Sequence, residues 1–419
     1  MTPSPCRRAT VLATFCAALL AGCASLPAMD ARAPFDSARL RDVDHAIAAD
    51  IAARKLPGAV YRLERSGVVY EQAFGQFTYE PGSAKVTPDT VFDAASLTKV
   101  LATAPSVLLL AEDGKLLLDA PLVRYFPECA NGGKEAITVR QLLTHTSGLP
   151  AGLPARPGWQ GGAAALTLAC SQTLTHTPGS FFRYSDINYI LLGLLVERAS
   201  GMPLERFAQE RLFRLLGMRD TGYLPLARRP AGAIAPTQRA PGVEGDAALH
   251  GDLAPGQLLQ GVVHDPTVRR MGGVAGSAGV FTTARDVARF ARMLVGEGTL
   301  EGTRVLSKDS VRLLTSVQTP PGLAMRGMGM DIDSPYAQRP RGSVFPVGSY
   351  GHTGFTGCIL WVDPQSRTFY VFLSNRVYPD DKSNVLALYT RLGTLSAQAA
   401  QVPSATTAPA AATALATPP

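Results

Sequence analysis

The chain of 419 residues is poor in several features that define common protein classes. It has two tryptophans and seven lysines, and arginine supplies most of its basic residues. The formal charge is +7, yet no basic run exceeds a pair, whereas a nucleic-acid-binding surface needs clustered basic side chains. The histidines are dispersed, and neither HExxH nor CxxC occurs. We therefore expect no nucleic-acid partner, no metal site and no cofactor.

Cysteine is also scarce, with six residues in all. Three of them lie at the N-terminus, at positions 6, 16 and 23. The other three are Cys129, Cys170 and Cys358, so at most one disulfide can form among them within a chain. This number is too small for a fold that depends on a disulfide framework.

The N-terminal segment is typical of a secretory signal. Arg7 and Arg8 precede the apolar stretch 9–21, which is too short to span a bilayer as a helix. The stretch ends in LAGC, which resembles a bacterial lipobox and implies cleavage before Cys23 and lipidation of its thiol. A plain signal-peptidase site is the alternative.

We therefore expect residues 1–22 to be a signal peptide and residues 23–35 a lipidated tether. The protein would be a periplasm-facing lipoprotein of the bacterial cell envelope, bound to the membrane through its N-terminal lipid. Because Ala24 rather than aspartate follows the cysteine, enteric-type sorting rules favour the outer membrane.

The two ends of the folded region mirror each other. A helical pattern over 36–56 precedes a hairpin pattern over 59–75, and a second hairpin over 357–375 precedes a helical pattern over 384–395. The predicted fold class is α+β: one antiparallel sheet built from both chain ends, flanked by helices.

The helical patterns in the middle of the chain predict an inserted, mainly helical subdomain at about 120–300. The stretch 229–279 is rich in glycine and proline, so we expect long ordered loops there. One folded domain is expected over 36–395. The Ala/Thr/Pro segment 396–419 is expected to be a disordered tail without a catalytic role.

The segment FDAASLTKV (92–100) holds Ser96 and Lys99 at S-x-x-K spacing. Three residues on a helix bring two side chains onto one face within contact range. A serine hydroxyl becomes a nucleophile when a nearby base takes its proton, and a lysine buried by the following apolar run could have a lowered pKa. The alternative is an N-capping serine beside a surface lysine.

Two further segments carry polar groups next to apolar elements. In RYSDINYILLG (183–193), Tyr184, Ser185 and Asp186 precede a strongly apolar helix, and the simple explanation is that Asp186 or Ser185 is its N-cap. In SYGHTGFTG (349–357), glycines interrupt a strand pattern, which indicates that something approaches its backbone closely.

Together and in this order, the three motifs resemble the serine β-lactamase and penicillin-binding-protein superfamily. The branch that fits is related to class C β-lactamases and also holds D-aminopeptidase-like enzymes and family VIII esterases. The resemblance extends over about 38–395. The stretch 261–290 resembles a subgroup linked to cell-wall turnover, in which many members read GHAG where this chain has Ser277.

The resemblance implies a role for each matching residue. Ser96 would be the acylated nucleophile, Lys99 its deprotonating partner, and Tyr184 a proton shuttle in acylation and deacylation. Asp186 stands where class C β-lactamases have asparagine, and it accepts hydrogen bonds as an anion but cannot donate them like an amide. The backbone N–H groups of Ser96 and Phe355 would bind the oxyanion.

The motif His352-Thr353-Gly354 bears on the substrate. Class C β-lactamases usually carry lysine in place of His352, and lysine offers a permanent cation for a substrate carboxylate. We therefore expect a serine hydrolase that cleaves amide or ester bonds of peptidoglycan fragments or related small molecules. A β-lactamase or short-chain carboxylesterase is the alternative, and an inactive cell-wall-binding protein is a further one.

Overall fold

The computed structural model describes residues 35–403, except 157, 241–253, 255, 335 and 337. The expected signal peptide and the lipidation of Cys23 fall outside the described residues, as does the tether apart from Phe35. The stretch 229–279, where we expected ordered loops, is described only in part.

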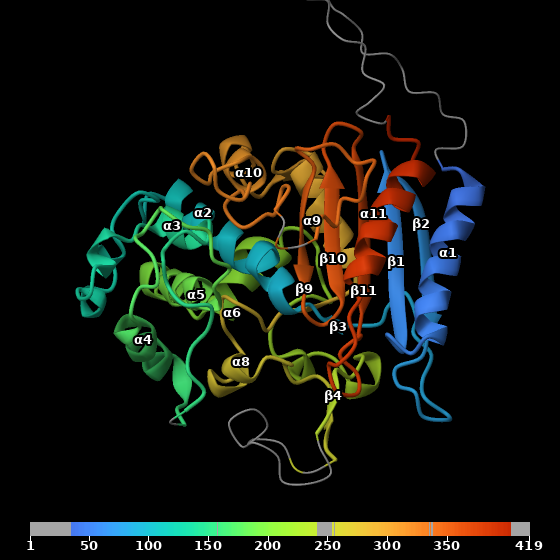
Figure 1. Cartoon of the computed structure of the whole chain (residues 1–419), viewed down its shortest axis with the longest axis horizontal. Helices are drawn as coiled ribbons and strands as arrows, with labels where there is room; N and C mark the ends of the chain where they lie inside the picture. The colour runs from blue at the N-terminus through green and yellow to red at the C-terminus, as the bar shows by residue number, and fades with distance from the viewer. Residues whose placement is uncertain are drawn as a thin grey trace, which may run out of the picture. The chain divides into compact units, whose positions relative to one another are not determined.

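A five-stranded antiparallel sheet joins the two ends of the folded region, as predicted (Figure 1). Its order is β2-β1-β11-β10-β9, so the first hairpin lies beside the last. Ala59 lies opposite Ser374, and Arg65 lies opposite Thr368. The strands are β1 (Gly58–Arg65), β2 (Val68–Gly75), β9 (Tyr350–Gly354), β10 (Cys358–Asp363) and β11 (Thr368–Ser374).

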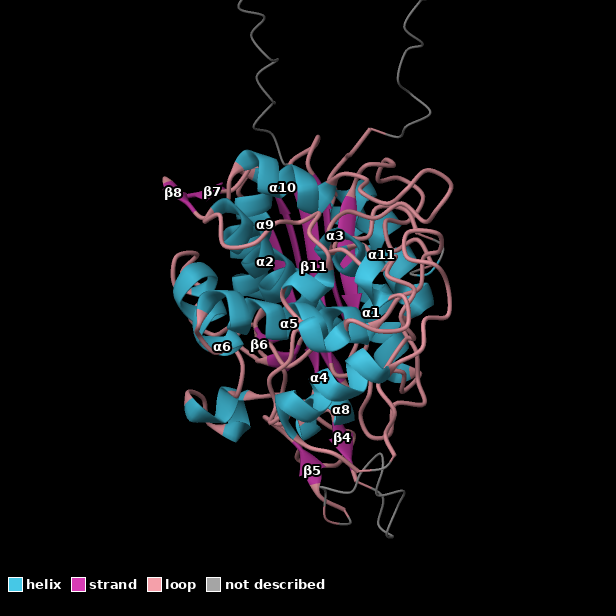
Figure 2. Ribbon diagram, turned by 90° about the vertical axis from the view of Figure 1, so that its left-hand side faces the viewer, coloured by secondary structure: helices cyan, strands magenta, loops and turns pink. Residues whose placement is uncertain are grey.

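Alternation along the strands gives the sheet two buried faces. On one face, Tyr61 and Trp361 pack with residues of helices α1 (Ser37–Ala52) and α11 (Leu386–Ala399). On the other face, Val60 and its neighbours on the strands belong to the main core, and α9 (Ala284–Val295) packs there. The predicted cover of the two terminal helices is confirmed, and α9 adds a third layer (Figure 2).

Helix α11 extends beyond its predicted end, so the tail predicted from 396 is wrong at its start. The Ser396 hydroxyl lies 2.7 Å from the Tyr61 hydroxyl. Ala397, Ala399 and Val402 are buried in the same cluster as the sheet. Alanine-rich composition does not reveal which small side chains face a core. Residues from 404 onward lie outside the described part.

The middle of the chain is mainly helical, as predicted, and it lies beside the sheet (Figure 1). Its helices are α2 (Ala104–Glu112), α3 (Val139–Leu143), α4 (Gly161–Ser171), α5 (Asp186–Ser200), α6 (Leu204–Ala208), α8 (Pro266–Arg270) and α10 (Lys308–Thr315). Short strands pair as β3 (Phe92–Asp93) with β6 (Phe281–Thr282), β4 (Gln238–Arg239) with β5 (Leu258–Leu259), and β7 (Thr299–Leu300) with β8 (Thr303–Arg304).

Two further features of the core concern cysteine and hydrophobic length. Cys129 and Cys170 form a disulfide, and Cys358 is a buried free thiol. The apolar stretch Ala95–Glu112 passes a length-and-composition test for a membrane span, but 83% of it is buried inside the protein. This stretch therefore belongs to the core of the protein.

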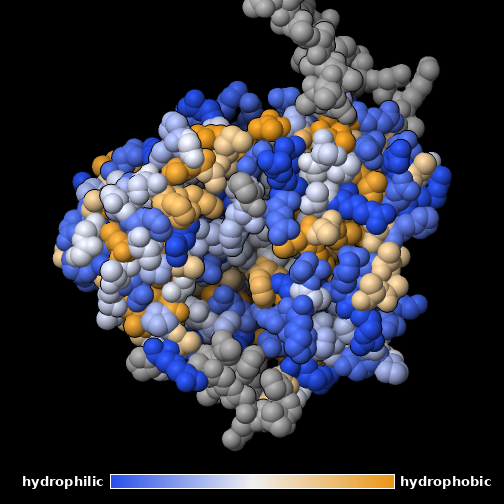
Figure 3. Space-filling model, in the orientation of Figure 1, coloured by the Kyte–Doolittle hydropathy of each residue, from blue (hydrophilic) through white to orange (hydrophobic). Residues whose placement is uncertain are grey.

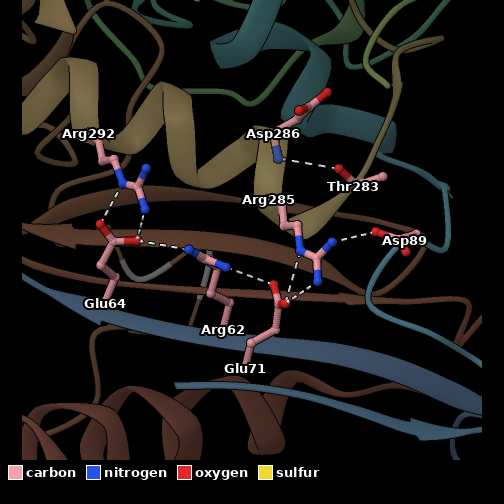
Figure 4. A network of polar contacts seen from close by, with 8 residues as sticks. All are labelled: Arg62, Glu64, Glu71, Asp89, Thr283, Arg285, Asp286 and Arg292. Atoms are coloured by element: carbon pink, nitrogen blue, oxygen red, sulfur yellow. Dashed lines mark hydrogen bonds and ion pairs between the residues drawn. The ribbon is translucent and has the colours of Figure 1, made fainter. Parts of the chain in front are cut away.

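Charged side chains fasten α9 to the sheet (Figure 4). Arg292 of α9 donates two hydrogen bonds to Glu64 of β1, at 2.6 and 2.9 Å. Arg62 bridges Glu64 and Glu71 at 3.2 and 2.8 Å, and Arg285 of α9 also contacts Glu71 at 3.0 Å. Glu64 is almost fully buried, so this network holds its charges within the layer between helix and sheet.

Candidate active site

Ser96 is positioned by a strained turn after β3. Ala95 has a φ of +46°, a left-handed conformation that costs a non-glycine residue on the order of 1–3 kcal/mol. The Asp93 carboxylate supports the turn by accepting hydrogen bonds from the backbone N–H of Ala95 at 2.9 Å and of His264 at 2.7 Å. Strain that is held in place by such contacts is typical of functional sites.

The chain does not continue as one regular helix after Ser96. A 3-10 turn (Ala95–Leu97) leads into a π-helical turn (Lys99–Thr103), and α2 follows. We expected Ser96 and Lys99 on one helix, without this irregular first part. The predicted proximity is nevertheless confirmed, because Lys99 Nζ lies 2.9 Å from Ser96 Oγ.

Lys99 is fully buried, and its Nζ has three acceptors within hydrogen-bond distance. They are Ser96 Oγ at 2.9 Å, the Ser277 carbonyl oxygen at 2.8 Å and Asp186 Oδ1 at 2.7 Å. The carbonyl and the carboxylate can only accept, so two N–H bonds of Lys99 point at them. An ammonium therefore donates its third N–H to Ser96, whereas a neutral amine would turn a lone pair to it.

The charge of Lys99 differs from the sequence-based expectation of a lowered pKa. Burial disfavours the ammonium, but the Asp186 carboxylate and the Tyr184 oxygen outweigh burial and raise the pKa of Lys99. The expectation considered only the apolar run beside Lys99, and it left out the anion that Asp186 places against Nζ. Lys99 is therefore an ammonium at neutral pH and a hydrogen-bond donor to Ser96.

Tyr184 lies in a stack of rings beside Lys99. Its ring centre is 4.5 Å from that of His145, 4.8 Å from that of Tyr336 and 5.0 Å from Lys99 Nζ. His145 is buried, and its Nδ1 accepts a hydrogen bond from the Ser185 backbone at 3.1 Å, so it holds the backbone next to Tyr184. Sequence reasoning missed Tyr336, which has no motif around it.

The glycine-rich loop 272–279 brings a backbone carbonyl to Lys99. A Cβ on Gly276 would lie 2.1 Å from the Tyr189 carbonyl oxygen and 2.8 Å from the backbone of Gly193, so only glycine fits between this loop and α5. Thr103 donates to the Gly276 carbonyl at 2.7 Å. The loop thereby holds the carbonyl of Ser277 against Lys99, and the Ser277 side chain takes no part in this contact.

Strand β9 forms the opposite side of the site. Gly354 packs so closely against the Ala94 carbonyl that a Cβ would lie 2.4 Å from its oxygen, which explains one glycine of the motif. Phe355 follows the strand with 54% of its surface exposed, and the Arg376 guanidinium lies 4.2 Å from its ring centre. Arg376 also donates to the Phe355 carbonyl at 2.7 Å, which fixes the backbone here.

His352 is buried on the same strand. Its Nδ1 lies 2.7 Å from the Thr353 carbonyl oxygen, and its ring centre lies 6.0 Å from that of Tyr184. Burial, the Arg326 guanidinium and the Lys99 ammonium lower the pKa of His352 well below its usual value. Arg326 is itself buried and contacts Asp331 at 3.5 Å and the Gly329 carbonyl at 3.0 Å. No sequence pattern had marked Arg326.

These groups meet around one cavity of about 790 Å³, and the face that Figure 3 shows is hollowed near its middle. Lys99 lies buried behind Ser96, and the other candidate residues line the cavity: Ser96, Tyr184, Asp186, His352, Thr353, Gly354 and Phe355. His264 and Asp265 form part of its wall, and Asp265 also caps α8 by accepting from the Val268 N–H at 2.9 Å.

Known proteins resemble this chain in sequence. The model of the family described as Beta-lactamase matches residues 43–394. A protein of Escherichia coli (strain K12) named "Putative D-alanyl-D-alanine carboxypeptidase" is 30% identical over 369 residues, which are 82% of this chain and 84% of that protein.

Solved structures agree on the fold. The octameric penicillin-binding protein homologue from Pyrococcus abyssi is 22% identical with a TM-score of 0.63, covering 86% of this chain and 79% of that one. EstCE1, a hydrolase with promiscuous acyltransferase activity, is 22% identical with a TM-score of 0.65, covering 85% of this chain and 98% of that one. The predicted fold class is confirmed.

Proposed function

The chain belongs to the beta-lactamase family of serine hydrolases, and from that premise we propose that it forms an acyl-enzyme on Ser96 with amide or ester substrates derived from peptidoglycan. The contact of 2.9 Å between Lys99 Nζ and the Oγ of Ser96, which lines the cavity, carries the proposal. The name of the Escherichia coli relative, with its D-alanyl-D-alanine substrate, supports the substrate class.

The charges of the site suggest how the proton moves. Because Lys99 is an ammonium, it cannot take the proton of Ser96. We assign this step to the phenolate form of Tyr184, whose ring centre lies 5.0 Å from Lys99 Nζ. In this proposal Tyr184 takes the Ser96 proton, and the Ser96 oxygen then bonds to the substrate carbonyl carbon.

The later steps reuse the same groups. The N–H groups of Ser96 and Phe355 bind the developing oxyanion, and each such donor contributes on the order of 3 kcal/mol. Tyr184 returns the proton to the leaving amine or alcohol as its bond to the carbonyl breaks. Water then attacks the acyl-enzyme, gives a proton to Tyr184, and releases the acid as Ser96 regains its hydrogen.

The proposed place of action is the bacterial cell envelope. The signal-like N-terminus and the LAGC sequence ending at Cys23 support an outer-membrane lipoprotein whose domain faces the periplasm. Fractionation of cells and labelling with a radioactive fatty acid test this separately. Label that remains in a Cys23→Ala variant contradicts the lipid anchor.

A covalent probe tests the chemistry. A fluorophosphonate is expected to label wild-type protein on Ser96, as mapped by peptide mass spectrometry, and the Ser96→Ala variant is expected to resist it. Absence of label in folded wild-type protein would favour the inactive cell-wall-binding alternative. Rates on a D-alanyl-D-alanine peptide, a short-chain nitrophenyl ester and a chromogenic cephalosporin then separate peptidase, esterase and β-lactamase.

A further inference from the structure

His352 is present as one defined tautomer. A carbonyl oxygen accepts hydrogen bonds and never donates them, so the 2.7 Å contact with the Thr353 carbonyl requires a hydrogen on Nδ1. In the neutral ring, Nε2 then carries a lone pair and no hydrogen. Two nearby cations, Arg326 and Lys99, oppose a second proton on the ring, and burial acts in the same direction.

This lone pair is left without a partner in the part of the chain that the structure describes. His352 is only 4% exposed, yet it lines the cavity that also holds Ser96 and Tyr184. A buried acceptor without a donor is unfavourable, and a ligand that supplies the donor removes that penalty. His352 is therefore a residue of the cavity wall whose unpaired acceptor would be stabilised by an N–H or O–H donor.

Neighbouring charges sharpen the chemistry of that group. The Asp186 carboxylate, whose side chain is 39% exposed, and Asp265 line the same cavity. Two guanidinium groups also line this cavity: that of Arg326 is engaged by Asp331 and the Gly329 carbonyl, and that of Arg376 donates to the Phe355 carbonyl. A substrate carboxylate next to His352 would face the lone pair of Nε2.

We propose that His352 selects substrates by accepting a hydrogen bond at Nε2 from an N–H group of the substrate, at the place where a lysine in this motif would bind a carboxylate. The inference rests on the function proposed above, because it names the substrate class of the same cavity. The preferred substrates are peptides whose residue after the scissile bond ends in an amide, and peptides with a free carboxylate there bind more weakly.

Two peptides that differ in one group test this. Acetyl-L-lysyl-D-alanyl-D-alanine and its C-terminal carboxamide are titrated into the full chain carrying Ser96→Ala, and both dissociation constants are measured by calorimetry. The carboxamide is expected to bind roughly tenfold more tightly, as one buried hydrogen bond allows. Equal binding, tighter binding of the acid, or no binding of either peptide overturns the inference.

Variants at position 352 in the same Ser96→Ala background assign the preference. His352→Phe removes the acceptor and is expected to abolish the preference, His352→Gln keeps an acceptor and is expected to retain part of it, and His352→Lys is expected to reverse it. Melting temperatures verify folding, and the ratio of the two constants cancels a general loss of affinity. A ratio that none of the three changes overturns the assignment to His352.

The proposed function has its own readout. Fluorophosphonate labelling of wild-type Ser96 does not depend on the carboxamide preference. Labelling together with a missing preference would leave the acyl-enzyme proposal standing and remove this inference. A preference without labelling would do the opposite.

Discussion

Neutralising Glu64 should destabilise the protein without changing its chemistry. The Glu64 side chain is 2% exposed and contacts Arg62, which is 10% exposed, and Arg292, which is 32% exposed. Glu64→Gln would leave these two guanidinium groups without their shared anion. Removing one partner of a buried ion pair typically costs about 3–5 kcal/mol. Because Arg292 can turn toward water and Arg62 keeps Glu71, the lower end, about 3 kcal/mol, is expected.

Calorimetry measures this loss of stability as a fall in melting temperature. An unfolding entropy of about 2.1 cal/mol/K per residue over roughly 370 residues turns 3 kcal/mol into a fall of roughly 4 °C in melting temperature. Glu301→Gln is the matched control, because Glu301 also pairs with an arginine of α9, at 2.8 Å, but is 62% exposed. Its melting temperature should stay close to wild type, since exposed pairs contribute little.

The refuting results are equally specific. None of the network residues lines the large cavity, so kcat/KM per folded molecule should be the same in Glu64→Gln and wild type. Equal melting temperatures for the two variants would show that the buried network does not fasten α9 to the sheet. A selective loss of kcat/KM would instead show that the network shapes the site.

Three further predictions concern the site and its supports. In Asp186→Asn, burial acts on Lys99 without the opposing carboxylate, so the pKa of Lys99 falls and the alkaline limb of the kcat/KM profile moves to lower pH. A higher kcat/KM at neutral pH would instead identify Lys99 as the base. Gly276→Ala should lower both melting temperature and activity because its Cβ has no room, whereas Gly232→Ala, which has open space, should behave as wild type. The double change Cys129→Ser/Cys170→Ser removes a cross-link over 41 residues and should cost roughly 4 kcal/mol of stability; unchanged calorimetric unfolding would contradict this.

The sheet could be predicted because its signals are local. Each hairpin of the sheet shows strand-like runs rich in β-branched and aromatic residues on both sides of a turn, and the pairing of Ala59 with Ser374 brings the two hairpins into one sheet. The end of α11 could not be found in this way. Alanines at 397 and 399 carry no amphipathic signal, and only the sheet beneath them decides that they are buried.

The site divides in the same manner. Ser96 and Lys99 are three residues apart, a spacing that predicts contact between their side chains on a helix. They are also in contact in the structure, although a 3-10 turn and a π turn replace the regular helix there. Arg326 lies in another segment of the chain, and its effect on the pKa of His352 depends on the folded structure. No spacing rule connects residues that meet only through tertiary packing.

Asp186 shows why the chemistry of a motif residue cannot be read from its own surroundings. The apolar run after Lys99 argues for a neutral amine, and burial does act in that direction. The Asp186 carboxylate 2.7 Å from Nζ and the Tyr184 oxygen reverse the outcome, because together they outweigh desolvation of the cation. Asparagine at this position would supply a dipole instead of a charge. The same lysine, with the same neighbours in sequence, would then hold its proton less strongly, so in the mechanism proposed above the residue at position 186 sets the charge of the group that faces Ser96.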